Sequence, residues 1–249
     1  MLETELKIMP ILLKYKEIWF SDHLYDVRGY DCVIFRNCDK MMEWPGFRRS
    51  ESTTIIMDLS KSEQELWKDM SETNCRKPIN RAKKMKVTIK VNQHYEEFSE
   101  INRAFRKEKG LARWDPSIDF MKKYGTLFVT EYNGEILSGL FCLSDERTMM
   151  QLITSSKRLE SSNEKKKEIA NANKLMIWES IIYAKRTGMK IYDWGGYYTG
   201  EVRDIQKERI NVFKRSFGGE IVTRYNYHKD YSLPMKLVKA MESIIKIKV

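Results

Sequence analysis

From residue 53 onward, blocks of apolar and polar positions predict a regular succession of strands and helices. β-Branched runs and period-two alternation indicate strands, and apolar side chains three and four positions apart indicate helices. Serines ahead of Glu63 and Glu65 supply the N-cap of the first helix, whose positive end suits these acidic residues. The expected strands cover residues 53–59, 87–91, 127–132, 136–143, 149–153, 190–194 and 221–225, and the expected helices cover about 60–74, 95–109, 169–185 and 210–217, with a further short helix after Asp115-Pro116.

The three middle strands form an antiparallel meander, because Asn133-Gly134 and residues 144–147 are good hairpin turns. A charged loop over residues 155–168 leads into the longest helix. This order predicts an α+β fold in which a mixed, mostly antiparallel sheet is flanked by helices. We divide the chain into a small N-terminal extension packed on the main domain (residues 1–50), the main domain (residues 51–231) and a basic amphipathic C-terminal helix (residues 232–249).

Composition narrows the class of protein. The chain of 249 residues is 42% hydrophobic and 12% aromatic, which excludes a disordered protein, and its net charge of +10 favours a polyanionic partner. Such partners include RNA, a nucleotide-linked substrate and an acidic membrane face. Because Glu3, Glu5 and Lys7 interrupt the N-terminus, we expect no signal peptide. No apolar run is long enough to span a membrane, so a cytoplasmic location is expected.

Several chemistries lack the residues that they require. The histidines show no HExxH or other paired-ligand spacing, so no metal site is expected, and GxSxG, GxxxxGK[ST] and GxGxxG motifs are absent. The scattered cysteines are typical of reduced thiols, with a single reactive thiol as the alternative. An enzyme built from this sequence works without a metal or a nucleophilic triad. The residues concerned are His23, His94, His228, Cys32, Cys38, Cys75 and Cys142.

A set of short strings occurs in fixed order between residues 58 and 220. They are Asp58-Leu59-Ser60, Glu65-Leu66-Trp67, Arg76, residues 80–84, residues 161–163, residues 170–175, Trp178-Glu179, residues 183–185, residues 190–196 (KIYDWGG) and residues 213–220 (FKRSFGGE). Together they resemble the Fem family, the FemA/FemB/FemX-type aminoacyltransferases that build peptidoglycan cross-bridges. The resemblance covers about residues 53–225 and implies the GNAT (acyl-CoA N-acyltransferase-like) fold.

The resemblance also implies an activity. An aminoacyl group would pass from charged tRNA to an amine acceptor, either a nucleotide- or lipid-linked cell-envelope precursor or a small molecule, and form an amide without a cofactor. Lys214 matches the position implied to stabilise the tetrahedral intermediate, and Phe213 would pack against the terminal ribose or base. Spacing alone permits another interpretation, in which Phe213 belongs to the core and Lys214 is solvated. Fem proteins usually contain two GNAT-like halves, whereas this chain has room for one half and about fifty residues, so the acceptor stays open.

Most of the further substrate-binding candidates have a structural alternative. The strand end and its two glycines allow close approach to a ligand, or form a plain strand exit. Asn173, like Asn171, either caps the long helix or donates to an acyl or phosphate group. Glu179 either orients the amine or forms a buried ion pair, and Trp114 either stacks on a base or pins a loop. The full set is Asp193, Trp194, Gly195, Gly196, Asn173, Glu179, Arg215 and Trp114.

An acid-free basic block over residues 75–90 is the candidate nucleic-acid surface, since every phosphate that it neutralises would steepen the salt dependence of binding. A solvated basic face is the alternative. The C-terminal helix either touches an anionic membrane face or packs against the main domain. Nothing in the sequence indicates an oligomeric state. The nucleic-acid candidates are Arg76, Lys77, Arg81, Lys83 and Lys84.

Two other functions compete with aminoacyl transfer. The first is an acyl-CoA-dependent N-acyltransferase on the same fold. Such enzymes hold the CoA pyrophosphate with a glycine-containing turn ahead of the long helix, but residues 155–173 contain no glycine. The second is a non-catalytic RNA-binding module, which would bind RNA through the basic block without turnover.

Overall fold

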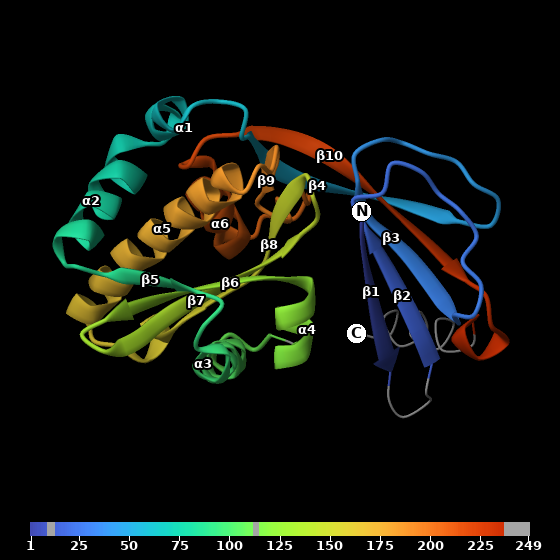
Figure 1. Ribbon diagram of the computed structural model, residues 1–249, viewed down its shortest axis with the longest axis horizontal. Helices are drawn as coiled ribbons and strands as arrows, with labels where there is room; N and C mark the ends of the chain where they lie inside the picture. Colours follow the sequence, from blue (N-terminus) through green and yellow to red (C-terminus); the bar gives the residue numbers. More distant parts are fainter. Residues whose placement is uncertain (9–12, 112–114, 237–249) are drawn as a thin grey trace. The chain divides into compact units, whose positions relative to one another are not determined.

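The computed structural model describes residues 1–8, 13–111 and 115–236 (Figure 1). The chain forms two compact units. The N-terminal unit comprises Met1–Thr53 and the C-terminal residues from Val222, and the central unit comprises Thr54–Ile221. The last strand is thus grouped with the N-terminal strands, whereas the sequence analysis placed it in the main domain.

Two strands are shared between the units. The boundary at Thr54 lies within β4 (Arg48–Asp58), and the boundary at Ile221 lies within β10 (Glu220–Asp230). Several helices of the central unit have a side-chain N-cap; Ser62, for example, forms a capping box with Glu65. Between β4 and β10 the elements are α1 (Glu63–Asp69), the π-helix η1 (Glu72–Arg76), α2 (Lys77–Lys84), β5 (Thr88–Val91), α3 (Tyr95–Glu108), α4 (Ile118–Tyr124), β6 (Gly125–Tyr132), β7 (Glu135–Ser144), β8 (Thr148–Ser156), the 3-10 helix η2 (Lys157–Glu160), α5 (Asn163–Arg186), β9 (Ile191–Asp193) and α6 (Ile205–Arg215).

The strand order in the central unit is β4-β9-β8-β7-β6-β5, and the predicted meander of β6, β7 and β8 is confirmed. All neighbouring pairs are antiparallel except β8 and β9, which run parallel only as far as the pair Met150 and Asp193. Beyond this pair β9 ends, while β8 continues to Ser156. The segment after Asp193 therefore leaves the middle of the sheet, which is where the candidate site lies.

Helices cover both faces of this sheet. Figure 1 shows α2 and α5 on one face and α3 and α4 on the other. Double coverage explains why β7 is buried along almost its whole length. Aromatic contacts join the layers: Trp67 meets Trp178 of α5 edge-on at 5.1 Å, and Phe128 of β6 meets Tyr183 at 5.3 Å. The α+β fold with a mostly antiparallel sheet is confirmed.

The N-terminal unit contains β1 (Leu2–Ile8), β2 (Leu13–Trp19) and β3 (Cys32–Cys38), in the order β1-β2-β3-β10. β1 and β2 are antiparallel, β2 and β3 are parallel, and β3 pairs with β10 in antiparallel fashion. Alternation along β3 sends Val33 and Phe35 into one core cluster and Cys32 and Ile34 into another.

Three local predictions were wrong or incomplete. The long helix begins at Asn163 rather than near residue 169, with Ser162 as its N-cap, so residues 163–168 are helical and not a loop. Residues 75–86 were assigned no element, but they contain the end of η1 and the helix α2. Of the expected C-terminal helix, residues 233–236 are helical and the remainder lies outside the described residues.

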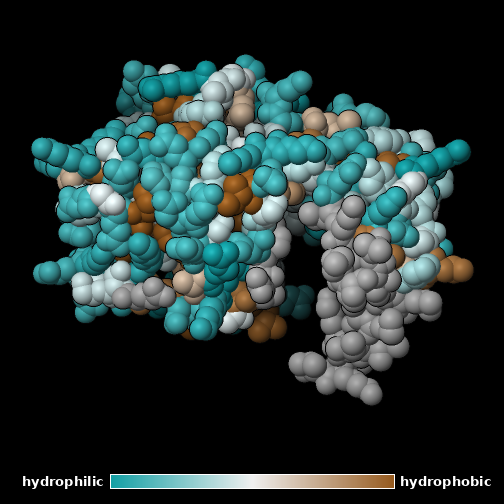
Figure 2. Space-filling view, turned by 60° about the horizontal axis from the view of Figure 1, so that its bottom comes forward, coloured by the Kyte–Doolittle hydropathy of each residue, from teal (hydrophilic) through white to brown (hydrophobic). Residues whose placement is uncertain are grey.

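Hydrophilic residues predominate on the face shown in Figure 2, in agreement with a sequence in which 32% of the residues are charged. Among the helices of residues 1–8, 13–111 and 115–236, none combines the length and apolar composition needed to cross a bilayer. All four cysteines are buried and none forms a disulfide.

Candidate active site

The site is built on the end of β9. The side chain of Asp193 is fully buried there, and its Oδ1 accepts hydrogen bonds from Thr54 Oγ1 at 2.6 Å and from the backbone N–H of Gly195 at 2.8 Å. A carboxylate that receives two hydrogen bonds of this length fixes the chain direction at the strand end. Asp193 therefore shapes the turn that follows it.

That turn needs its two glycines for different reasons. Gly195 and Gly196 have φ of +56° and +46°, values in the left-handed region that disfavour side chains. A Cβ on Gly195 would also lie 2.6 Å from the carbonyl oxygen of Gln151 on β8, whereas a Cβ on Gly196 would meet nothing within 4 Å. Position 195 is restricted by both space and conformation, and position 196 by conformation alone.

Lys214, near the end of α6, reaches into this turn. Its Nζ donates hydrogen bonds to three successive backbone carbonyls: those of Trp194 at 3.0 Å, of Gly195, and of Gly196 at 2.6 Å. Burial lowers the pKa of Lys214 to about 8, and the nearby negative charge of Asp193 partly opposes that shift. The predicted cation and the predicted glycine turn are therefore in direct contact.

An aromatic cluster supports the same turn. Trp194 is fully buried and lies 4.9 Å from Phe217 and 6.4 Å from Phe213, measured between ring centroids. Phe213 is only partly buried and contacts Phe217 at 5.5 Å. The ring of Phe213 thus belongs to the packing around Trp194 and keeps an exposed part.

The end of α6 is tied to the segment between α1 and α2. The backbone N–H of Ser71 donates to the carbonyl of Ser216 at 2.7 Å, and the thiol of Cys75 donates to the same carbonyl at 3.2 Å. Ser71 is the N-cap of the π-helix η1, an irregular helix of a type frequent at functional sites. Since α2 continues directly from η1, this contact links the Lys214 helix to the basic block.

The basic block presents an exposed face. Ile79 and Ala82 of α2 are buried, whereas Lys77, Arg81 and Lys84 recur at helical spacing on its exposed side. The side chains of Lys77 and Glu72 approach each other to 3.3 Å, so part of the charge at the start of α2 is compensated. Positive charge is densest toward the end of the helix.

Glu179 of α5 faces this helix. Its Oε1 lies 4.0 Å from Lys83 Nζ, and Lys83 also lies over the ring of Trp67 at 5.7 Å. Of its two sequence interpretations, the structure favours the ion pair, although the pair is half-exposed and not buried. Lys83 is correspondingly less suited to phosphate contact than Arg81 and Lys84.

Three predicted site residues carry a buried polar atom that has no hydrogen-bond partner within the part of the chain that the structure describes. These atoms are Trp194 Nε1, Asn173 Oδ1 and Arg76 Nε. Buried polar groups are nearly always paired, so such atoms call for a ligand, water or another partner.

Asn173 does not cap α5, because this helix begins ten residues earlier. Its capping interpretation was wrong.

The remaining candidates are more dispersed. Arg215 is exposed at the end of α6. Trp114 lies outside the described residues. Thr54, Ser71 and Ser216 contribute to the site but were not predicted. Neither the hydroxyl of Thr54 nor the backbone groups of Ser71 and Ser216 carry a sequence signal of their distant partners.

A separate cavity of about 440 Å³ lies between α3, the turn joining β6 and β7, and η2. Its lining combines apolar side chains such as Ile101 and Phe105 with carboxylates. These carboxylates outnumber the lining Lys157 and His94, so the cavity suits a cationic group better than it suits RNA. The lining carboxylates are Glu97, Glu100, Glu108, Glu131 and Glu135.

Comparison with known proteins establishes the fold. The structure of FemX superposes with a TM-score of 0.66 at 13% identity, covering 94% of this chain and 85% of that chain. L-PGS from Bacillus licheniformis gives 0.52 at 16% identity, with 85% and 72% covered. The C-terminal domain (DUF2156) of a putative lysylphosphatidylglycerol synthetase from Agrobacterium fabrum gives 0.53 at 11% identity, with 86% and 72% covered.

The implied GNAT-like fold is confirmed by these likenesses, which at such low identity concern the fold alone. The match to FemX extends over most of that chain rather than one half of it. No protein-family model matches the sequence, and no curated protein matches it.

Proposed function

We propose that this protein is an acyltransferase that moves an aminoacyl group from charged tRNA to an amine acceptor and forms an amide. One observation carries the proposal: the Lys214 ammonium is held over a glycine turn at the point where β9 ends, on a helix whose end is hydrogen-bonded to the basic η1–α2 segment. A charge-stabilising group and a phosphate-attracting surface thus belong to one connected set of elements.

The chemistry follows from the placement of this charge. The acceptor amine attacks the ester carbonyl carbon, and the carbonyl oxygen becomes negatively charged in the tetrahedral intermediate. Lys214 exchanges one backbone carbonyl for this oxygen and stabilises it. The intermediate then expels the tRNA ribose oxygen, which takes up the proton that the amine loses. Because an aminoacyl ester is already activated, alignment and one cation supply much of the required catalysis.

The buried polar atoms that lack a hydrogen-bond partner among the described residues also support the binding of a ligand at this site. Trp194 Nε1 lies beside the turn, and Asn173 Oδ1 and Arg76 Nε come from α5 and η1. An unpaired buried group costs about 1–3 kcal/mol unless a ligand, water or another group supplies the missing hydrogen bond.

An acyl-CoA donor is the second candidate, and the start of α5 disfavours it. The segment ahead of α5 is a 3-10 helix without glycine, and the ammonium groups of Lys157 and Lys165 contact Glu135 at 3.0 and 2.6 Å. These cations are therefore partly neutralised before any pyrophosphate arrives. One fold neighbour bears a name that denotes an aminoacyl lipid, which adds to the case for aminoacyl transfer.

The proposal is tested with total tRNA charged with labelled amino acids and a small-molecule extract. After the reaction, raised pH hydrolyses esters and spares amides, so label that survives measures amide formation. We expect surviving label with the wild type and with Lys207→Ala, a change on the exposed side of α6, and little with Lys214→Ala. If label survives only when acyl-CoA donors are supplied, the donor is acyl-CoA and not charged tRNA. If the protein binds RNA in a salt-sensitive way but transfers no label, it is an RNA-binding module.

A further inference from the structure

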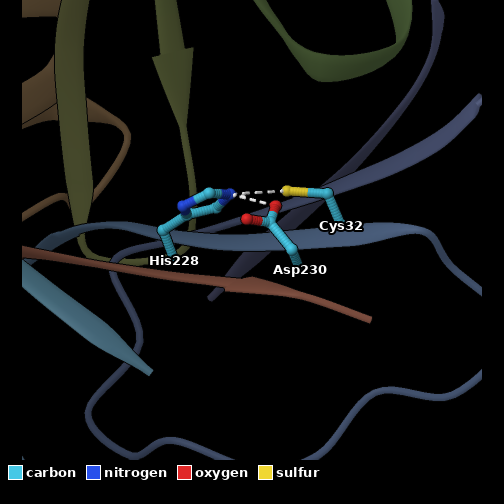
Figure 3. A group of neighbouring side chains, drawn as sticks. All are labelled: Cys32, His228 and Asp230. Carbon is cyan, nitrogen blue, oxygen red and sulfur yellow. Dashed lines mark hydrogen bonds and ion pairs between the residues drawn. The ribbon is translucent and has the colours of Figure 1, made fainter. Parts of the chain in front are cut away.

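Three metal-binding residue types meet in the N-terminal unit, whereas the candidate active site belongs to the central unit. Cys32 begins β3, and His228 and Asp230 lie near the end of β10. The antiparallel register places Asp230 opposite Cys32 and His228 opposite Ile34, so all three side chains share one face of the sheet (Figure 3).

Their ligand atoms converge on a small volume. His228 Nε2 lies 3.0 Å from Cys32 Sγ and 2.7 Å from Asp230 Oδ1, and the three atoms lie within 4.8 Å of one another. Both contacts fall on the same ring nitrogen, as Figure 3 shows. In a nucleophilic triad the thiol and the carboxylate would occupy opposite nitrogens of the ring. Convergence on one point is instead the arrangement of ligands around an ion.

The surroundings suit a partly enclosed site. Cys32 is fully buried in a cluster with Leu13, Tyr15 and Met235. The Asp230 side chain is 7% exposed and that of His228 is 22% exposed. A buried carboxylate needs a compensating cation, and in the metal-free chain the guanidinium of Arg48 supplies one to Asp230.

We propose that Cys32, His228 and Asp230 bind a divalent transition-metal ion of the zinc class. Thiolate, imidazole and carboxylate are the ligand types of Zn²⁺, and three protein ligands leave a fourth position for water or another donor. Tetrahedral zinc spaces its ligands roughly 3.3–3.7 Å apart, so small side-chain rotations would open the present contacts for the ion. On binding, the Cys32 thiol releases its proton to solvent, and His228 carries its ring proton on Nδ1 so that Nε2 presents a lone pair.

Arg48, the first residue of β4, competes with such an ion. Its guanidinium donates to Asp230 Oδ2 at 2.7 Å and lies 3.1 Å from His228 Nδ1, while 68% of its side chain is exposed. A donor at Nδ1 favours the tautomer that carries its proton on Nε2, which is the opposite of what the metal requires. Because Arg48 is largely solvent-exposed, it can leave when an ion enters.

Titration of the full-length, reduced protein with Co²⁺ tests the proposal, since cobalt reports its ligands spectroscopically. We expect one ion per chain, a thiolate-to-cobalt charge-transfer band and the visible bands of a tetrahedral centre. Zn²⁺ should displace the cobalt and raise the melting temperature. Asp230→Asn and Cys32→Ser should weaken binding about 100-fold or more, because even outer-shell partners contribute 10–100-fold.

Matched variants separate this site from adventitious binding. Cys38→Ser removes another buried thiol of β3, one that belongs to the other core cluster, and should leave the cobalt spectrum unchanged. Arg48→Gln should tighten binding by removing the competing charge. Absence of a thiolate band, equal loss of it in Cys32→Ser and Cys38→Ser, or unchanged affinity in Asp230→Asn would overturn the proposal. The inference is independent of the proposed transferase activity.

Discussion

The ammonium of Lys214 donates a hydrogen bond to the backbone carbonyl of Trp194 at 3.0 Å, although twenty positions separate the two residues in sequence. Together with the bonds to the next two carbonyls, it holds the glycine turn in place and locates a positive charge at the end of β9. A residue in this position has both a structural and a proposed catalytic role, and the two can be separated by experiment.

Removing the charge tests the catalytic role. Lys214→Ala should lower kcat by about 100-fold or more, as expected when one oxyanion-stabilising donor is lost. Lys214→Arg should restore part of this activity because it keeps a cation, although a guanidinium cannot reproduce the three carbonyl contacts. Thermal unfolding of each variant controls for loss of the turn. Equal activity of the alanine variant and the wild type would exclude Lys214 from the mechanism.

The pKa of Lys214 predicts a dependence of activity on pH. Since burial lowers it to about 8, the catalytic cation is lost as the pH rises through that value, and kcat should fall on the alkaline side. Arginine stays charged, so this decline should be absent from the Lys214→Arg profile. An unchanged alkaline decline in that variant would assign it to another group.

The same pKa predicts a dependence of stability on pH. The unfolded chain keeps its Lys214 proton up to the ordinary pKa of 10.5, whereas the folded chain releases it from about pH 8. The unfolded state binds more protons within this window, so the contribution of Lys214 to the free energy of unfolding rises as the pH increases from 8 to 10.5. Urea unfolding of Lys214→Met should show less of this rise than the wild type.

The glycine turn provides a matched pair of substitutions. Gly196→Ala should destabilise the protein by about 1 kcal/mol, because alanine must adopt a left-handed conformation but meets open space. Gly195→Ala should cost clearly more, since its Cβ also collides with the Gln151 carbonyl at 2.6 Å. Urea denaturation of both variants measures the difference, and equal costs would contradict the described turn.

The buried contact between Thr54 and Asp193 is open to a similar comparison. Thr54→Val keeps the side-chain shape but removes the 2.6 Å hydrogen bond to a fully buried carboxylate, and should destabilise the protein by about 1–3 kcal/mol. Thr54→Ser keeps the donor and should lose less. A valine variant as stable as the wild type would show that the carboxylate has another source of compensation.

The exposed end of α2 is the proposed tRNA contact. The double charge reversal Arg81→Glu, Lys84→Glu should weaken tRNA binding and flatten its dependence on salt by about one to two in the logarithmic slope. Lys83 is less suitable for this test because it already pairs with Glu179. Lys107→Glu with Lys109→Glu makes the same charge change on the exposed end of α3 and serves as control. Equal effects of the two pairs would indicate long-range charge rather than contact.

The sequence alone determined the order of the strands and of most helices in the central unit, though not α2, and the motif that contains Lys214. Both depend on neighbours along the chain: periodicity, hairpin turns such as Asn133-Gly134, and the strings around residues 190–196 and 213–220. The start of α5 was missed because residues 163–168 are charged and lack an apolar stripe, although Glu and Lys favour helices.

Tertiary structure alone decided which distant residues meet. Strand register brings Asp230 opposite Cys32, and the parallel pairing of β8 with β9 brings Gly195 against Gln151. The Ser71 contact with Ser216 depends on how two helical segments pack. None of these pairings leaves a local pattern in the sequence, because a given strand or helix can pair or pack with many different segments. The secondary-structure elements can therefore be predicted from the sequence, whereas the sites form only when these elements are assembled.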